Sequence, residues 1–285
     1  MMSSFFSLVM RWNIIKQKKT MTNNTLTIKN RSSLYWALKD SGVLIVRSLK
    51  HIFKNIDQMM SLVFQPIMFL LLFRYVFGGA INTGGTSYVN YLVAGILIQM
   101  AAFGATTTSF NIAMDMKRGI IDRFRSLPMS NATVLIGHVV ADLARNIMSS
   151  IVMLSVGLLV GFRPTATFKE WIFALGMLLL FTLAISWLSA ILGLLAKSVE
   201  AVQWMSFMII FPLTFASSAF VPTEGMPRLL RAFAENQPVT HVIEAMRGYM
   251  VGTPIGNHAL IAIIWFVSII IVSVPLSGFL FRRLK

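Results

Sequence analysis

The segment DMKRGIIDRFRSLPMS, residues 115–130, is a short basic stretch between two long apolar runs, residues 91–113 and 132–162. A run of ~20 apolar residues is long enough to cross the ~30 Å hydrocarbon layer of a bilayer as a helix. Four further runs have the same character: residues 59–81, 171–196, 201–221 and 259–281. The sequence therefore predicts an all-α membrane protein with six transmembrane helices.

The composition supports this class. Of the 285 residues, 56% are hydrophobic and 12% are charged. Because lipid satisfies no free backbone group, continuous apolar runs cross a membrane as helices, and the runs exclude a barrel of alternating strands. The apolar runs leave no segment long enough for a soluble catalytic domain. The chain contains no cysteine, which excludes disulfides and thiolate metal sites.

The distribution of positive charge predicts the orientation. The net charge is +15, and the lysines and arginines concentrate before Met59, in residues 114–131 and after Phe281. Lys and Arg close to span ends are retained on the cytoplasmic side, so we expect a multi-pass protein of the cell membrane with both termini in the cytoplasm. The cations lack the interleaved aromatic residues of a nucleic-acid groove. Membrane lipids are therefore the expected counter-charge, and nucleic acid is not an expected partner.

Three regions are expected along the chain: a flexible leader in residues 1–32, an interfacial amphipathic helix in residues 33–58, and a six-helix transmembrane domain in residues 59–285. In the second region Leu34, Leu38 and Ile45 recur at helical spacing with cations on the other side, as in a helix on the inner membrane surface. This helix either anchors the chain to the membrane through its positive charges or positions a partner protein. The first residues do not form a secretory signal, and either Met1 or Met21 is the working start.

The basic segment is itself amphipathic. Its apolar residues recur at helical spacing, at Ile120 or Ile121, Phe124 and Leu127. Pro128 then ends the expected helix. Such a stripe can enter a groove on a cytoplasmic protein while the surrounding charges fix its register. The alternative is a loop that its cations hold inside and that lies on lipid.

This segment, followed by GHVVADLARN, resembles the cytoplasmic coupling region of type-2 ATP-binding-cassette exporter permeases of the daunorubicin-resistance kind. Two further stretches fit the same family: FQPIMFLLLFRYVFGGAI, residues 64–81, and FPLTFASSAFVPTEGMPRLLRAFAENQPVTHVIEAMRGYMVG, residues 211–252. The resemblance extends from about Leu34 to the C-terminus. Asn131 and His138 depart from it, because many relatives carry Arg at these positions.

The resemblance implies a permease that exports a hydrophobic or amphipathic compound, either a drug or a lipid-like molecule. It implies a homodimer or heterodimer of permease protomers docked on two ATPase subunits. We expect the coupling to the ATPase to run through the basic segment, at Asp115, Lys117, Arg118, Gly119, Ile120, Ile121, Asp122, Arg123, Phe124, Arg125, Leu127 and Pro128.

The ATPase must be another chain, because no stretch here matches the phosphate-binding loop G-x-x-x-x-G-K-[ST]. The chain is therefore not expected to be an enzyme. No cofactor is expected in it, and ATP and Mg²⁺ would be bound by the partner ATPase.

Polar residues within the predicted spans are candidates for transport. His138, Asp142 and Arg145 share one face of the third span near its inner end. A charge at the bilayer centre costs about 2.5–3.5 kcal/mol, so we expect Asp142 and Arg145 to pair; a gate, a substrate contact and proton chemistry are the alternatives. Spans two and five offer a possible substrate path at Gln99, Thr106, Thr107, Thr214, Ser217 and Ser218. Equally, these side chains could bond to their own helices or between helices.

The connection between spans five and six is expected to contain two short amphipathic helices. Met226, Leu229 and Phe233 are helically spaced, and Pro238 begins a second run. The resemblance implies that the two helices form a re-entrant pair on the outer side.

Two other classes of function compete with the exporter. An ion-coupled secondary transporter would need buried carboxylates near the midplane, and only Asp142 lies inside a predicted span. An intramembrane hydrolase would need His138 close to a serine, yet Ser149 and Ser150 lie roughly three turns further along the same helix.

Overall fold

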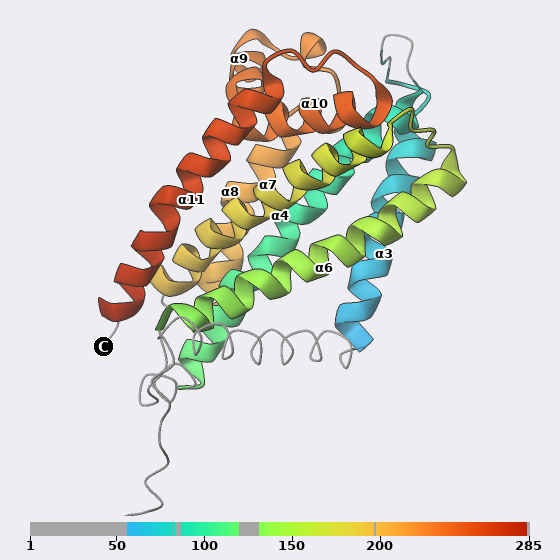
Figure 1. The fold of residues 1–285 in the computed structure, drawn as a ribbon. Helices are drawn as coiled ribbons and strands as arrows, with labels where there is room; N and C mark the ends of the chain where they lie inside the picture. Colours follow the sequence, from blue (N-terminus) through green and yellow to red (C-terminus); the bar gives the residue numbers. More distant parts are fainter. Residues whose placement is uncertain (1–55, 82, 84–86, 120–130, 197, 284–285) are drawn as a thin grey trace, which may run out of the picture. The chain divides into compact units, whose positions relative to one another are not determined.

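The computed structural model describes residues 56–81, 83, 87–119, 131–196 and 198–283, and all regular secondary structure in these residues is helical (Figure 1). The predicted all-α class is confirmed for this part of the chain. The predicted leader lies outside the described residues, as do residues 33–55 of the predicted interfacial helix and residues 120–130 of the basic segment. Every described residue belongs to the unit Asp40–Lys285.

Each of the six predicted apolar runs contains a helix. The helices are α3 (Ile56–Leu72), which continues into the π-helix η1 (Phe73–Phe77), α4 (Tyr88–Lys117), α6 (Asn131–Val160), α7 (Phe168–Leu195), α8 (Val199–Phe215) and α11 (His258–Arg283). Within the described ranges, four helices are long and apolar enough to cross a membrane: Tyr88–Lys117, Val134–Val160, Phe168–Leu195 and His258–Phe281. Val63–Phe77 and Val199–Phe215, in the first and fifth predicted spans, are shorter apolar helices.

Local sequence explains several helix ends. Thr167 and Glu170 form a capping box at the start of α7, and the hydroxyl of Ser198 accepts a hydrogen bond from the backbone N–H of Ala201 at the start of α8. α8 ends at Phe215, before the predicted end of its run at residue 221, and the chain then turns so that the Ser218 carbonyl accepts hydrogen bonds from Tyr91 of α4 and Arg247 of α10.

Three short elements connect α8 to α11: the 3-10 helix η2 (Thr223–Gly225), α9 (Arg228–Asn236) and α10 (Pro238–Val251). The two predicted helices are therefore present. α9 is amphipathic as expected, with Leu229 fully at its surface. α10 packs against α4, α7 and α11 and buries most of its side chains.

α4 and α7 pack against each other, and most of the other helices contact one or both of them. α4 contacts α6, α7, α8 and α10, and more than half of its residues are buried. Small residues permit the closest approaches: a Cβ atom added at Gly193 of α7 would lie 2.6 Å from the Ser109 carbonyl oxygen of α4. α4 begins at the end of the bundle where α9 and α10 lie, and it ends at the opposite end, where α6 begins and α11 ends (Figure 1).

Candidate functional site

A fully buried carboxylate joins three helices. Asp142 of α6 accepts hydrogen bonds at Oδ2 from the hydroxyl of Thr108 on α4 and, at 3.1 Å, from the hydroxyl of Ser186 on α7. Its Oδ1 atom lies 2.7 Å from Nη1 of Arg145. The predicted Asp142–Arg145 pair is therefore present, and the sequence did not indicate its two hydroxyl donors.

His138, the third member of the predicted cluster, contacts α4 directly. Its Nε2 atom lies 3.2 Å from Oδ2 of Asp115, in the last turn of α4. One face of α6 also reaches α4 through Arg145, whose Nη1 donates to the Gly104 carbonyl at 3.4 Å. Together with the Thr108–Asp142 bond, these contacts hold α4 and α6 together along several turns.

The described part of the predicted coupling segment is the end of α4. Asp115 and Lys117 belong to its last turn, Arg118 caps it, and Gly119 follows with φ 64°. This left-handed conformation is the usual way in which a glycine ends a helix. The remaining predicted coupling residues lie outside the described residues: Ile120, Ile121, Asp122, Arg123, Phe124, Arg125, Leu127 and Pro128.

A groove of about 300 Å³ lies between α4 and α8. Aromatic rings and polar side chains line it together, at Phe103, Thr106, Thr107, Phe110, Gln203 and Phe207. Of the residues predicted for a substrate path, Thr106 and Thr107 therefore share one surface. Mostly apolar walls with a few polar groups are typical of sites that bind small organic molecules.

The other predicted path residues do not line this groove. Gln99 is 3% exposed, and its amide has no hydrogen-bond partner among the described residues. The hydroxyls of Thr214 and Ser217 donate to backbone carbonyls three or four residues earlier in the chain, as the structural alternative expected. Ser218 lies in the turn after α8, where its N–H donates to the hydroxyl of Thr240.

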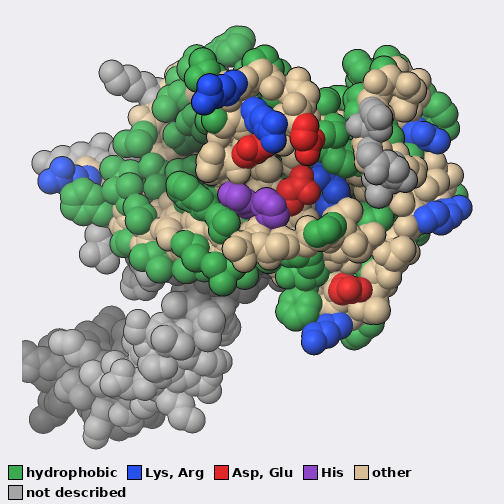
Figure 2. Space-filling view, turned by 90° about the horizontal axis from the view of Figure 1, so that it is seen from above, with side chains coloured by type: hydrophobic (Ala, Val, Ile, Leu, Met, Phe, Trp, Pro, Cys, Tyr) green, Lys and Arg blue, Asp and Glu red, His purple; other side chains and the backbone are tan. Residues whose placement is uncertain are grey.

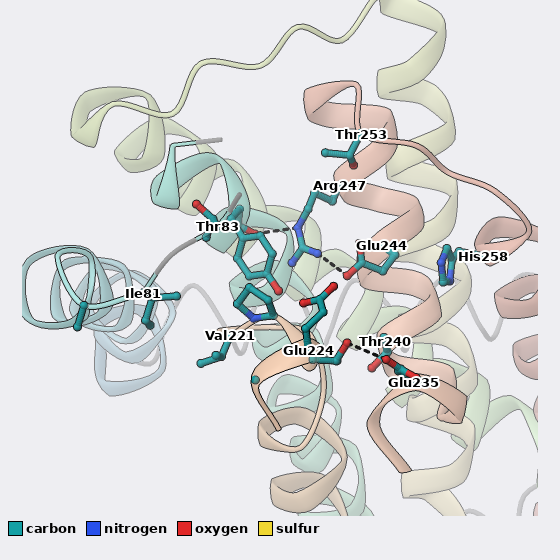
Figure 3. Close-up of a pocket in the computed structure, with 15 residues that line it drawn as sticks. Ile81, Thr83, Val221, Glu224, Glu235, Thr240, Glu244, Arg247, Thr253 and His258 are labelled. Atoms are coloured by element: carbon teal, nitrogen blue, oxygen red, sulfur yellow. Dashed lines mark hydrogen bonds and ion pairs between the residues drawn. The ribbon is translucent and has the colours of Figure 1, made fainter. Parts of the chain in front are cut away.

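A larger cavity, of about 1080 Å³, opens at the end of the bundle formed by η2, α9, α10 and the start of α4; we call it the glutamate chamber. Three carboxylates line it, those of Glu224, Glu235 and Glu244 (Figure 3). Viewed from this end, acidic, basic and histidine side chains gather in a recess bordered by apolar ones (Figure 2). Glu235 pairs with Arg231 at 2.7 Å, and this hydrogen bond lowers the pKa of the Glu235 carboxyl.

Arg247 connects the chamber to α4. It is 3% exposed, lies 2.5 Å from Glu244, and donates to the carbonyls of Ser218 at 2.9 Å and Tyr91 at 3.2 Å. Its guanidinium carbon lies 3.6 Å from the centre of the Tyr91 ring. The pairing of Glu244 with Arg247 is the kind that their i, i+3 spacing favours, whereas nothing local in the sequence indicated the two carbonyls that Arg247 reaches.

Two histidines meet beside the chamber. The Nδ1 atoms of His241 on α10 and His258 at the start of α11 are 2.8 Å apart. Burial, and to a lesser extent the charge of His258, lowers the pKa of His241 and so favours its neutral form. Sequence reasoning missed this contact because nothing local brings the two positions together.

The sequence is similar to a transporter family model and to several transport permeases. The family model described as ABC-2 type transporter matches residues 41–251. The daunorubicin resistance ABC transporter permease protein DrrB1 of Streptomyces coeruleorubidus is 33% identical over 196 residues, which are 69% of each chain. The probable doxorubicin resistance ABC transporter permease protein DrrC of Mycobacterium tuberculosis is 25% identical over 214 residues, 74% of this chain and 77% of the relative. The inner membrane transport permease YadH of Escherichia coli is 22% identical over 190 residues, 64% of this chain and 72% of the relative.

Proposed function

This chain belongs to the ABC-2 type transporter family, and from that premise we propose how it is arranged in the membrane, how it is driven and what it carries. It is the membrane subunit of an ATP-binding-cassette exporter and works with separate ATPase subunits. This membership decides against the ion-coupled carrier and the intramembrane hydrolase. The observation that carries the function is the family match across residues 41–251, which includes α4, α6, α7 and α8.

The proposed unit contains two permease protomers, identical or different, on two ATPase subunits that bind ATP and Mg²⁺. Each protomer crosses the membrane six times, with α3 and η1 together forming the first span and α8 the fifth. Both termini lie in the cytoplasm, and the glutamate chamber faces outward, where η2, α9 and α10 form a re-entrant cap. The charge distribution supports this orientation, since α4 ends with Lys117 and Arg118 and α11 ends with Arg283, and both helix ends lie away from the chamber (Figure 1).

The basic segment is the proposed contact with the ATPase. It joins α4 to α6, and its first residue, Asp115, contacts His138 of α6. Energy reaches the permease through this contact, because ATP is hydrolysed on another chain. The ATPase groove receives the apolar stripe that contains Phe124.

The variant Phe124→Asp tests this contact. We expect it to lose the co-purifying ATPase subunit, because a carboxylate cannot enter an apolar groove without a large desolvation penalty. The control is Phe168→Asp, a change at an 82% exposed phenylalanine at the start of α7, close to the end of the bundle that carries the chamber. If Phe124→Asp retains a full complement of ATPase and transports normally, the segment is not the coupling contact.

The proposed cargo is hydrophobic or amphipathic. The groove between α4 and α8 offers aromatic surface with two hydroxyls and an amide, and relatives are named for resistance to daunorubicin and doxorubicin. We expect daunorubicin to change the ATP hydrolysis rate of the purified complex, and Phe207→Ala to raise the concentration required. Ile264→Ala, on a 57% exposed side chain of α11, is the matched control. If both variants respond to the same concentration of daunorubicin, the groove is not part of the substrate path.

A further inference from the structure

The carboxylate of Asp142, on α6, is hydrogen-bonded to side chains of both α4 and α7. Its Oδ2 atom accepts from Thr108 of α4 and Ser186 of α7, while its Oδ1 atom pairs with Arg145 of its own helix. Its exposed fraction is 0%. A buried carboxylate in apolar surroundings is stable only while its hydrogen-bond donors stay in place. Sliding α6 past α4 or α7 would therefore leave Asp142 with unmet hydrogen bonds.

Asp142 connects the two helices next to the basic segment with a third helix, α7. α4 and α6 are the two helices that the basic segment joins, so a movement of the segment acts directly on both. α7 is not part of this hairpin, and it packs against α10 and α11 near the glutamate chamber. The hydroxyl of Ser186 is the polar link through which Asp142 holds α7 to α6.

We propose that Asp142 is a positioning residue for transport: by holding Thr108 and Ser186 together, it makes α4, α6 and α7 shift as one body when the ATPase moves the basic segment. The inference rests on the proposed coupling function and deepens it. Asp142 touches neither nucleotide nor cargo in this role. Its effect is to carry the displacement of the hairpin to α7 and so toward the chamber end of the bundle.

A distance measurement between α6 and α7 tests the proposal. The chain has no cysteine, so spin labels can be attached at two introduced cysteines, Ile151→Cys on α6 and Ile172→Cys on α7. These side chains are 60% and 55% exposed, so the labels disturb little packing. The α6–α7 distance is recorded by pulsed electron paramagnetic resonance in the complex with the ATPase, without nucleotide and after trapping with ATP and vanadate.

The test variant removes both donors with nearly isosteric changes, Thr108→Val together with Ser186→Ala, and leaves the Asp142–Arg145 pair intact. These changes preserve side-chain shape and keep Arg145 paired with the carboxylate. The matched control is Thr182→Val, which removes a fully buried hydroxyl one turn earlier on α7. That hydroxyl donates to the Leu178 carbonyl of its own helix at 2.8 Å, so its removal breaks a bond within α7.

We expect the wild-type and Thr182→Val complexes to keep the same distance in both states. In the double variant, ATP hydrolysis should persist while the most populated α6–α7 distance shifts on trapping. A double variant whose distance does not change overturns the proposal, and so does a wild-type complex whose distance shifts. Failure of the proposed function is distinguishable, because the wild-type protein would then purify without an ATPase subunit.

Discussion

Substitution of Arg247 tests how much its contacts between α10, α4 and the turn after α8 stabilise the protein. Arg247 is almost fully buried, pairs with Glu244 at 2.5 Å and donates to two backbone carbonyls. Removing one partner of a buried ion pair destabilises a protein by about 3–5 kcal/mol, because the other partner is left uncompensated. At about 2–4 °C per kcal/mol, Arg247→Ala should lower the melting temperature by about 6–20 °C.

Thermal unfolding of the protein in lipid nanodiscs measures this effect. Arg247→Lys should give a smaller decrease, since an ammonium keeps the charge and loses the planar fork that reaches both carbonyls. Arg231→Ala is the matched control, because its pair with Glu235 is also local in sequence but is 45% and 42% exposed. We expect no resolvable change for the control. If Arg247→Ala and Arg231→Ala have the same melting temperature, the buried contacts of Arg247 do not stabilise the protein.

Three further predictions concern the same region. Gly95→Val should prevent folded protein from accumulating in the membrane, because a Cβ atom there would lie 2.1 Å from a backbone oxygen; Gly176→Ala, where the Cβ meets nothing within 4 Å, should accumulate normally. Melting temperatures should fall as the pH decreases below about 6.5, because the lowered pKa of His241 means that the unfolded chain binds the proton more tightly, and His241→Gln should weaken this dependence. Tyr91→Phe, which removes a 2.9 Å hydrogen bond, should reduce the free energy of unfolding by about 1 kcal/mol in denaturant titrations, and an unchanged midpoint would refute its contribution.

The sequence predicted the features that depend on local pattern. Long apolar runs predicted helices at α4, α6, α7 and α11, because hydrophobic length is the main requirement for crossing a bilayer. The i, i+3 spacing predicted the Asp142–Arg145 pair, because residues three apart lie on one face of a helix. The short helix α9 also followed from spacing, since its apolar residues recur at helical intervals.

Contacts between distant parts of the chain could not be predicted in the same way. Thr108 and Ser186 lie 34 and 44 residues from Asp142, and nothing in either local sequence identifies the partner. Arg247 reaches Tyr91 across 156 positions. The spacing of its apolar residues predicted α10 as a short amphipathic helix, but it did not indicate that α10 packs against α4, α7 and α11 and buries most of its side chains. Such contacts depend on how helices pack, which the order of residues within one helix does not reveal.

The most direct test of the central claim is the composition and activity of the complex isolated from its native membrane. A tagged form of this chain should purify with an ATPase that contains the G-x-x-x-x-G-K-[ST] loop, and ATP hydrolysis should disappear when the lysine of that loop is changed to alanine. The chain alone in liposomes should move no daunorubicin. Transport of daunorubicin by the chain alone, with no ATPase present, would contradict the account.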